Sequence, residues 1–445
     1  MSNEPALPAT DDLRGSRREI FAWAMYDWAN SAYSTISITV LASYVKYDVL
    51  PGKAGTLLLS AGLGGTMFVA AMLSPILGAV ADAHASKRRW LAGTALAGAA
   101  AVSLMFFTGP DLAWLLVLLY LLANLGMELS QGFYNGFLPE IASDENMGRV
   151  SAWGYALGYL GGGLALALIL VMFQWGDLVG LPDDLVFRKR LGLLFTGLWW
   201  AGFTVPCLMV LRDRGRPATR APGILAAARK AFGEVRRTLV NIRHYRMLAL
   251  FLVGFLVYND GVSTVITQSH QFAIEKFKMG TTELGLVILM VQFIALPGAM
   301  LVGALADRIG QKPMLLVCLA VWTLLLALAF FISEKWQFWC MAALAGLVLG
   351  GTQSVSRAIM GLMTPERHSA EFFGFFNLSS KAASVVGPVL FGFMLAYTGN
   401  PNYAITSLLV FIVVGAAIVL PLNVAEGQRH ARQSKEEGGG RRAEG

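Results

Sequence analysis

Ionisable side chains occur inside several long apolar stretches of this sequence. They are Asp27, Glu128, Asp260, Arg357 and Lys381. A charge at bilayer depth costs about 2.5 to 3.5 kcal/mol on insertion scales, so each of these groups needs a partner or a water-filled cavity. The sequence therefore predicts a polar interior in which such groups bind a solute, carry a proton or form ion pairs.

One apolar stretch carries a regular stripe of polar residues. Its members are separated by steps of 4, 3 and 4 residues, which places them along one face of a helix: Asn124, Glu128, Gln131 and Asn135. Such a face cannot be turned to lipid. At an offset of 226 residues a second stripe reads Gly350, Ser354, Arg357 and Gly361, with Gln353 beside it. The two stripes predict a shared cavity, to which we also assign Asn30 and Asn259.

These residue types are suited to binding a zwitterion. Arg357 would fork to a carboxylate, and Glu128 or Asp27 would face an amine. The alternative is structural, with ion pairs between Glu128 and Arg357 or between Asp27 and Lys381. Asp260 is a further candidate for proton coupling, along with Asp27, Glu128 and Lys381, and a neutral buried hydrogen-bonding role is its alternative.

The composition requires a membrane around these groups. Of 445 residues, 56% are hydrophobic and 14% are charged, against roughly 25% charged in soluble domains. Apolar stretches of about 20 residues can each cross a hydrocarbon core of roughly 30 Å as a helix. The sequence predicts an all-α membrane protein with twelve such helices, over residues 20–45, 55–81, 89–108, 112–138, 148–174, 189–211, 247–274, 282–306, 313–333, 336–363, 371–398 and 402–424.

The remaining motifs exclude other chemistry. Cys207, Cys318 and Cys340 lie in apolar stretches without paired spacing or a neighbouring histidine, so we expect neither disulfides nor a metal site. We find no nucleotide-binding loop and no spacing typical of a catalytic triad. An enzyme is not expected, nor is a cofactor.

The basic residues are concentrated in the connections on one side of the predicted membrane. Lys and Arg number 25 in the N-terminus, the even-numbered connections and the C-terminus, against 8 in the odd-numbered connections. The positive-inside rule then places both termini in the cytoplasm. The net charge of +7 is spread over loops, which argues against a nucleic-acid partner.

This pattern divides the chain into five segments. Two membrane halves at 20–211 and 247–424 are flanked by a cytoplasmic tail at 1–19 and a disordered tail at 425–445. The connection 212–246 alternates apolar and basic residues at helical spacing, which predicts an amphipathic helix on an anionic membrane surface.

The two halves are copies of each other. The segment "GAVADAHASKRRWL" from Gly78 matches "GALADRIGQKPML" from Gly303 at an offset of 225, and Pro139 and Glu140 match Pro365 and Glu366 at 226. An even number of spans separates the copies, so the six-helix repeats are parallel.

This repeated segment resembles the loop motif of the major facilitator superfamily, which implies that fold and a role in cytoplasmic gating. The matching residues are Gly78, Asp82, Lys87 and Arg88 in the first copy and Gly303, Asp307, Arg308, Gly310 and Lys312 in the second. The first copy has Ala83 where the motif has Arg. Residues 22–33 ("AWAMYDWANSAY") and 350–392 are similar to the vacuolar amino-acid effluxer family linked to autophagy and its bacterial relatives, which implies amino-acid export.

We therefore expect a monomeric, multi-pass secondary transporter that moves a small polar solute by alternating access. The expected partners are membrane lipids, the solute and protons, and the membrane would be the inner membrane if the source is bacterial. A lipid or lysolipid flippase and a solute sensor that does not transport are the alternatives.

Overall fold

The computed structural model describes residues 15–214, 245–382 and 386–440, and the described chain is helical throughout. The N-terminal half contains α1 (Arg17–Ile36), α2 (Lys53–Leu57), α3 (Leu63–Ala83), α4 (Lys87–Leu104), α5 (Ala113–Asn135), α6 (Leu138–Ile141), α7 (Met147–Trp175) and α8 (Leu185–Val210). The C-terminal half contains α10 (Arg246–Phe277), α11 (Thr281–Ile309), α12 (Gln311–Ala329), α13 (Lys335–Met363), α14 (Ser369–Ala382), α15 (Val386–Thr398), α16 (Pro401–Ser407), α17 (Leu409–Val419) and α18 (Val424–Gly440).

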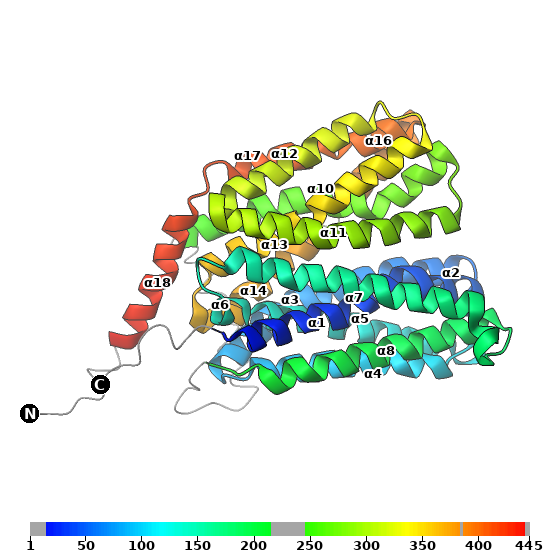
Figure 1. The fold of residues 1–445 in the computed structure, drawn as a ribbon, viewed down its shortest axis with the longest axis horizontal. Coiled ribbons are helices and arrows are strands. Elements are labelled where there is room, and N and C mark those ends of the chain that lie inside the picture. Colours follow the sequence, from blue (N-terminus) through cyan, green and yellow to red (C-terminus); the bar gives the residue numbers. More distant parts are fainter. Residues whose placement is uncertain (1–14, 215–244, 383–385, 441–445) are drawn as a thin grey trace, which may run out of the picture.

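The two halves lie side by side, with α7 against α11 and α3 against α14 (Figure 1). Helix α1 begins, and α18 lies, at the same end of the bundle, at the left of Figure 1. We call this the terminal end, and the other the opposite end. The expected linker helix at 212–246 lies almost entirely outside the described residues.

Among the described residues, eleven helices are long and apolar enough to cross a membrane. Helix α1 is not one of them, because Asp27, Asn30 and several hydroxyl-bearing residues make it too polar on average. It is nonetheless prolonged by two π-helical segments, Ser37–Leu41 and Tyr44–Val49. The prediction of twelve spans is therefore confirmed for eleven, while α1 as a span and the cytoplasmic termini stay predictions.

Helix α1 begins earlier than predicted because Ser16 and Glu19 form a capping box. The C-terminal tail differs more, since the predicted disorder after residue 425 was wrong for α18. The side chain of Asn423 accepts the N–H of Glu426 at 3.1 Å, and Arg432 pairs with Asp144 of the N-terminal half. The helix also packs against α13, since a Cβ on Gly427 would lie 2.6 Å from Sδ of Met363, and Ala431 is buried. A cap, this packing and the ion pair thus hold a segment whose composition is mainly polar.

Two glycines set how closely the halves approach at the terminal end. A Cβ on Gly78 of α3 would lie 2.3 Å from the carbonyl oxygen of Ala370 in α14, and one on Gly303 of α11 would lie 2.3 Å from Cβ of Ala152 in α7. Both are the first residue of the repeated motif, so the motif glycine serves the same close helix contact in both halves.

Candidate functional site

A cavity of about 660 Å³ lies between the halves. Its lining comes from α1, α3, α5 and α7 on one side and from α10, α11, α12, α13 and α14 on the other. All of the predicted cavity residues line it: Asn30, Asn124, Glu128, Gln131, Asn135, Asn259, Gln353 and Arg357. Helical spacing thus located the first stripe correctly. Of the second stripe only Arg357 lines the cavity, together with Gln353, whereas Gly350, Ser354 and Gly361 are not lining residues.

The floor of the cavity toward the terminal end is an ion pair between the halves. Arg357 Nη1 on α13 donates to Asp27 Oδ2 on α1 at 2.9 Å, and their side chains are 1% and 7% exposed. Arg357 also donates to Asn135 Oδ1 at 3.2 Å and to the hydroxyl and carbonyl of Ser151 at 3.0 and 2.6 Å. The N–H groups of Arg357 thus donate to acceptors of the protein itself. This agrees with a structural role in an ion pair and not with a guanidinium that is free to bind a solute carboxylate.

Aromatic rings enclose this guanidinium. Its carbon lies 4.0 Å from the ring centroid of Tyr155, 4.9 Å from that of Trp23 and 5.6 Å from that of Tyr134. The hydroxyl of Tyr134 donates to Asp27 at 2.8 Å. Stacked rings strengthen their hold on a cation when water is excluded, so this floor is both charged and dry.

Gly154 makes room for the pair, because a Cβ there would lie 2.5 Å from Arg357 Nη2 and 2.6 Å from Asp27 Oδ2. Sequence reasoning did not place this glycine, Ser151, Trp23 or Tyr134 in the site. A signal was available in the sequence, because Gly154 is a small residue on the face of α7 that is directed at α13.

A second ion pair lies on the cavity wall. Lys381 Nζ on α14 contacts Glu128 Oε1 on α5 at 2.9 Å, with side chains 27% and 11% exposed. Both predicted pairings between the halves were wrong, because the carboxylates have exchanged partners: Arg357 binds Asp27, and Lys381 binds Glu128. The exposed pair is thus the one a solute can reach.

The amides of the cavity have mixed roles. Gln353 Oε1 accepts from the hydroxyl of Tyr159 at 2.5 Å, which links the halves beside the floor. Asn124 donates to the carbonyl of Tyr120 at 2.8 Å within its own helix. Gln131 and Asn259 line the cavity near these groups and are available as polar contacts for a solute.

Asp260 is not among the lining residues. It is buried, and its carboxylate oxygens accept the backbone N–H of Gly387 at 3.0 and 2.9 Å. A Cβ on Gly387 would lie 2.8 Å from Asp260 Oδ1 and 2.0 Å from Thr264 Oγ1. The contact holds the first turn of α15 against α10, so the geometry favours the structural alternative for Asp260.

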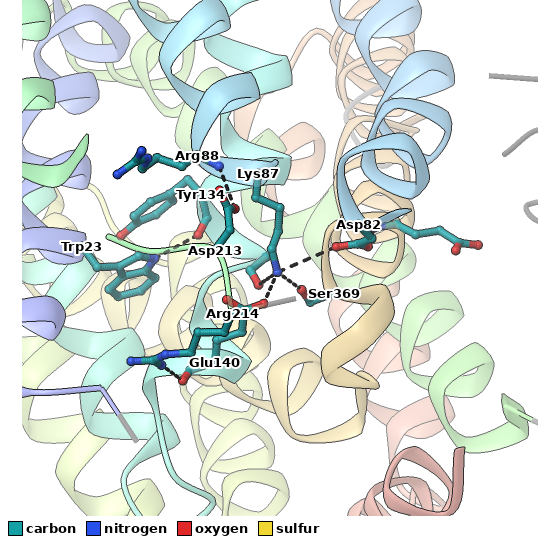
Figure 2. A network of polar contacts seen from close by, with 11 residues as sticks. Trp23, Asp82, Lys87, Arg88, Tyr134, Glu140, Asp213, Arg214 and Ser369 are labelled. Carbon is teal, nitrogen blue, oxygen red and sulfur yellow. Dashed lines mark hydrogen bonds and ion pairs between the residues drawn. The ribbon is translucent and has the colours of Figure 1, made fainter. Parts of the chain in front are cut away.

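The first copy of the loop motif forms a buried network at the terminal end. Figure 2 shows Lys87 between Asp82 and Glu140, with its ammonium directed at Ser369 of α14. Asp82 also accepts the N–H of Glu371 at 3.0 Å, which joins α3 to the start of α14. Lys87 supplies the cation of this copy, although Ala83 stands where the motif has Arg.

Two neighbouring contacts extend this network. The N–H of Arg88 donates to Asp213 Oδ1 at 3.1 Å, and Arg214 donates to the carbonyl of Glu140 (Figure 2). Burial raises the pKa of Asp213, which lies beyond the end of α8, while the Arg88 N–H opposes that shift. The motif is thereby tied to the segment that leaves α8.

The second copy repeats the cross-half contact. Asp307 on α11 accepts the N–H groups of Gly148 and Arg149 at the start of α7, at 2.9 and 3.0 Å. Gly310 has a φ of +99° at the junction of α11 and α12, a conformation that suits glycine. Lys312 donates to the carbonyl of Leu420 at 2.6 Å, whereas Arg308 is exposed. Both aspartates thus accept N–H groups at the first turn of a helix in the other half.

Replacing Lys87 with methionine is expected to weaken this closure. It removes the contact with Ser369 and leaves Asp82 and Glu140 without their cation, and hydrogen bonds to charged groups contribute roughly 1.5 to 3 kcal/mol. The population open at the terminal end should rise about 10- to 100-fold. It is measured by maleimide labelling of a cysteine at Gln131 in a Cys340→Ser background, with reagent added from the terminal side.

Arg89→Met is the matched control, because Arg89 is exposed on the same turn. Equal labelling of the two variants would mean that Lys87 does not hold the gate.

Comparison with known proteins agrees with this architecture. The sequence profile of the family described as vacuole effluxer Atg22 like matches residues 56–432. The uncharacterised MFS-type transporter YxiO of Bacillus subtilis is 32% identical over 404 residues, which cover 89% of this chain and 93% of YxiO. This chain belongs to the Atg22-like family. It is a multi-pass membrane transporter of the major facilitator type.

Fungal relatives are more distant from this Atg22-like transporter. Autophagy-related protein 22-1 of Neosartorya fischeri is 27% identical over 308 residues, covering 64% of this chain and 49% of that protein. The chain thus spans about half the length of the fungal relatives.

Solved structures share the fold. The human organic anion transporter MFSD10 has a TM-score of 0.70 at 13% identity, covering 91% of this chain and 99% of that one. A bacterial homologue of ferroportin in an outward-facing state has a TM-score of 0.67 at 15% identity, covering 91% and 98%. At these identities the likeness concerns the fold alone.

Proposed function

We propose that this protein is a secondary active transporter that carries a small zwitterionic solute, such as an amino acid, through the central cavity by alternating access. The observation that carries the proposal is the Glu128–Lys381 pair, which presents both signs of charge, partly exposed, on the cavity wall. A zwitterion can replace each partner, so that its carboxylate meets Lys381 and its ammonium meets Glu128 without leaving a charge unpaired.

The direction and the coupling are part of the same proposal. We propose export as the direction, although efflux out of a vacuole, for which the matching family is named, delivers solute into the cytoplasm. Closure at the terminal end by Asp82, Asp307 and the Asp27–Arg357 floor corresponds to a state open away from the cytoplasm, if the termini are cytoplasmic. We assign proton coupling to Glu128. Among the described ion pairs Lys381 is its only cationic partner, so a solute that binds Lys381 removes that partner and favours protonation of the Glu128 carboxylate.

The test is a thermal-shift screen of the purified protein against amino acids, short peptides and lysolipids, followed by counterflow in proteoliposomes with every ligand found. Stabilisation and counterflow by a zwitterionic amino acid are expected. Binding without counterflow would indicate a sensor, and stabilisation by lysolipids alone would overturn the polar solute.

A lysolipid flippase is the second candidate, and one observation favours it. The C-terminal half contributes a large apolar part of the lining, including Ile266, Ile288 and Met341. In the screen described above, lysolipid counterflow at a rate exceeding that of every amino acid would select this candidate.

A further inference from the structure

The two sides of the cavity differ in chemistry. On the N-terminal half, α1 and α5 contribute mainly carboxylate, amide and hydroxyl groups, such as Glu128, Gln131 and Ser34. On the C-terminal half, apolar side chains extend from the middle of the cavity toward the opposite end. We call this surface the apolar wall and define it by Ile266, Ile288, Val291, Met341, Ala342 and Ala345.

The apolar wall reaches into the C-terminal half without a counterpart in the other half. Residues of α12, from Trp322 to Ala329, take part in the lining, whereas the corresponding helix of the first repeat, α4, contributes none among its described residues. The repeat therefore cannot account for this surface. On α13 the apolar lining continues beyond the wall to Leu349, so that the stretch from Met341 to Leu349 corresponds to roughly 12 Å along the helix.

This surface is open to the cavity and not filled by neighbouring side chains. Ile266 is 43% exposed, and Ile288, Val291, Met341 and Ala342 are half-buried. Apolar surface that lines a polar cavity gains free energy when an apolar group covers it. The wall is continuous with the Glu128–Lys381 pair within one cavity, so the covering group can belong to the solute whose charges meet that pair.

We propose that the apolar wall binds an extended alkyl portion of the transported solute, longer than the apolar side chains of the standard amino acids. The solute class is then a zwitterionic amphiphile with its head group at Glu128 and Lys381 and its chain along α13. This inference rests on the proposed function, because it places the head group at the same pair.

The experiment uses a series of α-amino acids with unbranched side chains: norvaline, norleucine, 2-aminooctanoic acid and 2-aminodecanoic acid. Affinities for the full-length protein are measured by competition in counterflow. Burial of one methylene contributes about 0.8 kcal/mol, so each added methylene should tighten binding about fourfold. The Ala342→Phe variant fills part of the wall, and it should bind 2-aminodecanoic acid at least about tenfold more weakly while binding norvaline like the unmodified protein.

Ala343→Phe is the matched control, since Ala343 lies on the same helix and is not part of the lining. It should retain the whole gain along the series. A flat series in the unmodified protein, or an identical gain in Ala342→Phe, would overturn the apolar wall as the chain site while the proposed function stands. If norvaline and all longer members fail to compete or to be transported, the zwitterion site fails, and this inference fails with it.

Discussion

Replacing Arg357 with alanine is expected to reduce transport at least about 100-fold while the protein still reaches the membrane. The substitution leaves Asp27 buried without its cation, and removing one partner of a buried ion pair costs about 3 to 5 kcal/mol. It also removes the link between α1 and α13 at the floor of the cavity. Transport is measured in proteoliposomes, and the melting temperature of the purified variant, which should fall, is recorded beside it.

A double variant separates a transport role from a purely structural one. Asp27→Asn with Arg357→Gln leaves no uncompensated charge, so its melting temperature should recover toward that of the unmodified protein. Its transport should stay low, because the Asp27–Arg357 ion pair, which joins the halves when the terminal end is closed, is absent. Normal transport by the double variant, or by Arg357→Ala, would show that the pair is structural only.

Neutralising Lys381 is expected to give the second large effect, a loss of solute affinity of about 10- to 100-fold. This estimate follows from roughly 1.5 to 3 kcal/mol for a hydrogen bond to a charged group. Lys381→Met should bind the zwitterion weakly with little change in melting temperature, since the side chain is 27% exposed. Binding is measured by isothermal titration with the solute that the screen identifies.

Glu128→Gln provides the complementary measurement. It should retain counterflow, which needs no proton, while a pH gradient no longer drives accumulation. Exchange of the two charges in Glu128→Lys with Lys381→Glu should restore part of the affinity that either single variant loses. Unchanged affinity in Lys381→Met would remove the pair from the solute site.

Much of the candidate site could be predicted from helical spacing. The stripe from Asn124 to Asn135 faces the cavity because residues three and four apart lie on one helix face. Its counterpart at an offset of 226 was correct only for Arg357, because the lining face of α13 runs through Ala342, Ala345, Leu349 and Gln353 instead. The repeat also paired Asp82 with Asp307, and in the structure each accepts N–H groups from a helix of the other half.

The ion-pair partners could not be predicted from spacing, because they depend on depth in the bundle. Arg357 lies six residues before Met363 at the terminal end, whereas Lys381 lies twelve residues after Ser369. That difference places Lys381 about 9 Å deeper. The predicted ends at residues 363 and 371 lie within two residues of those in the structure, so comparing the depths of the charged residues would have selected the observed partners.

The residues that enclose Arg357 also escaped prediction. Trp23, Tyr134 and Tyr155 lie on three helices, and aromatic residues in an apolar stretch carry no signal that separates a cation-binding ring from a lipid-facing one. The helix after residue 425 also escaped prediction, because its polar sequence does not show that Gly427 packs against Met363 of α13.

The two ion pairs divide their signs by half: Asp27 and Glu128 belong to the N-terminal half, and Arg357 and Lys381 belong to the C-terminal half. When the halves separate, one face of the cavity is negative and the other positive, so an electric field crosses the cavity parallel to the membrane plane. A dipolar solute aligns with that field whichever end is open. Such a solute would keep one orientation relative to the two halves, with its ammonium toward the N-terminal half and its carboxylate toward the C-terminal half.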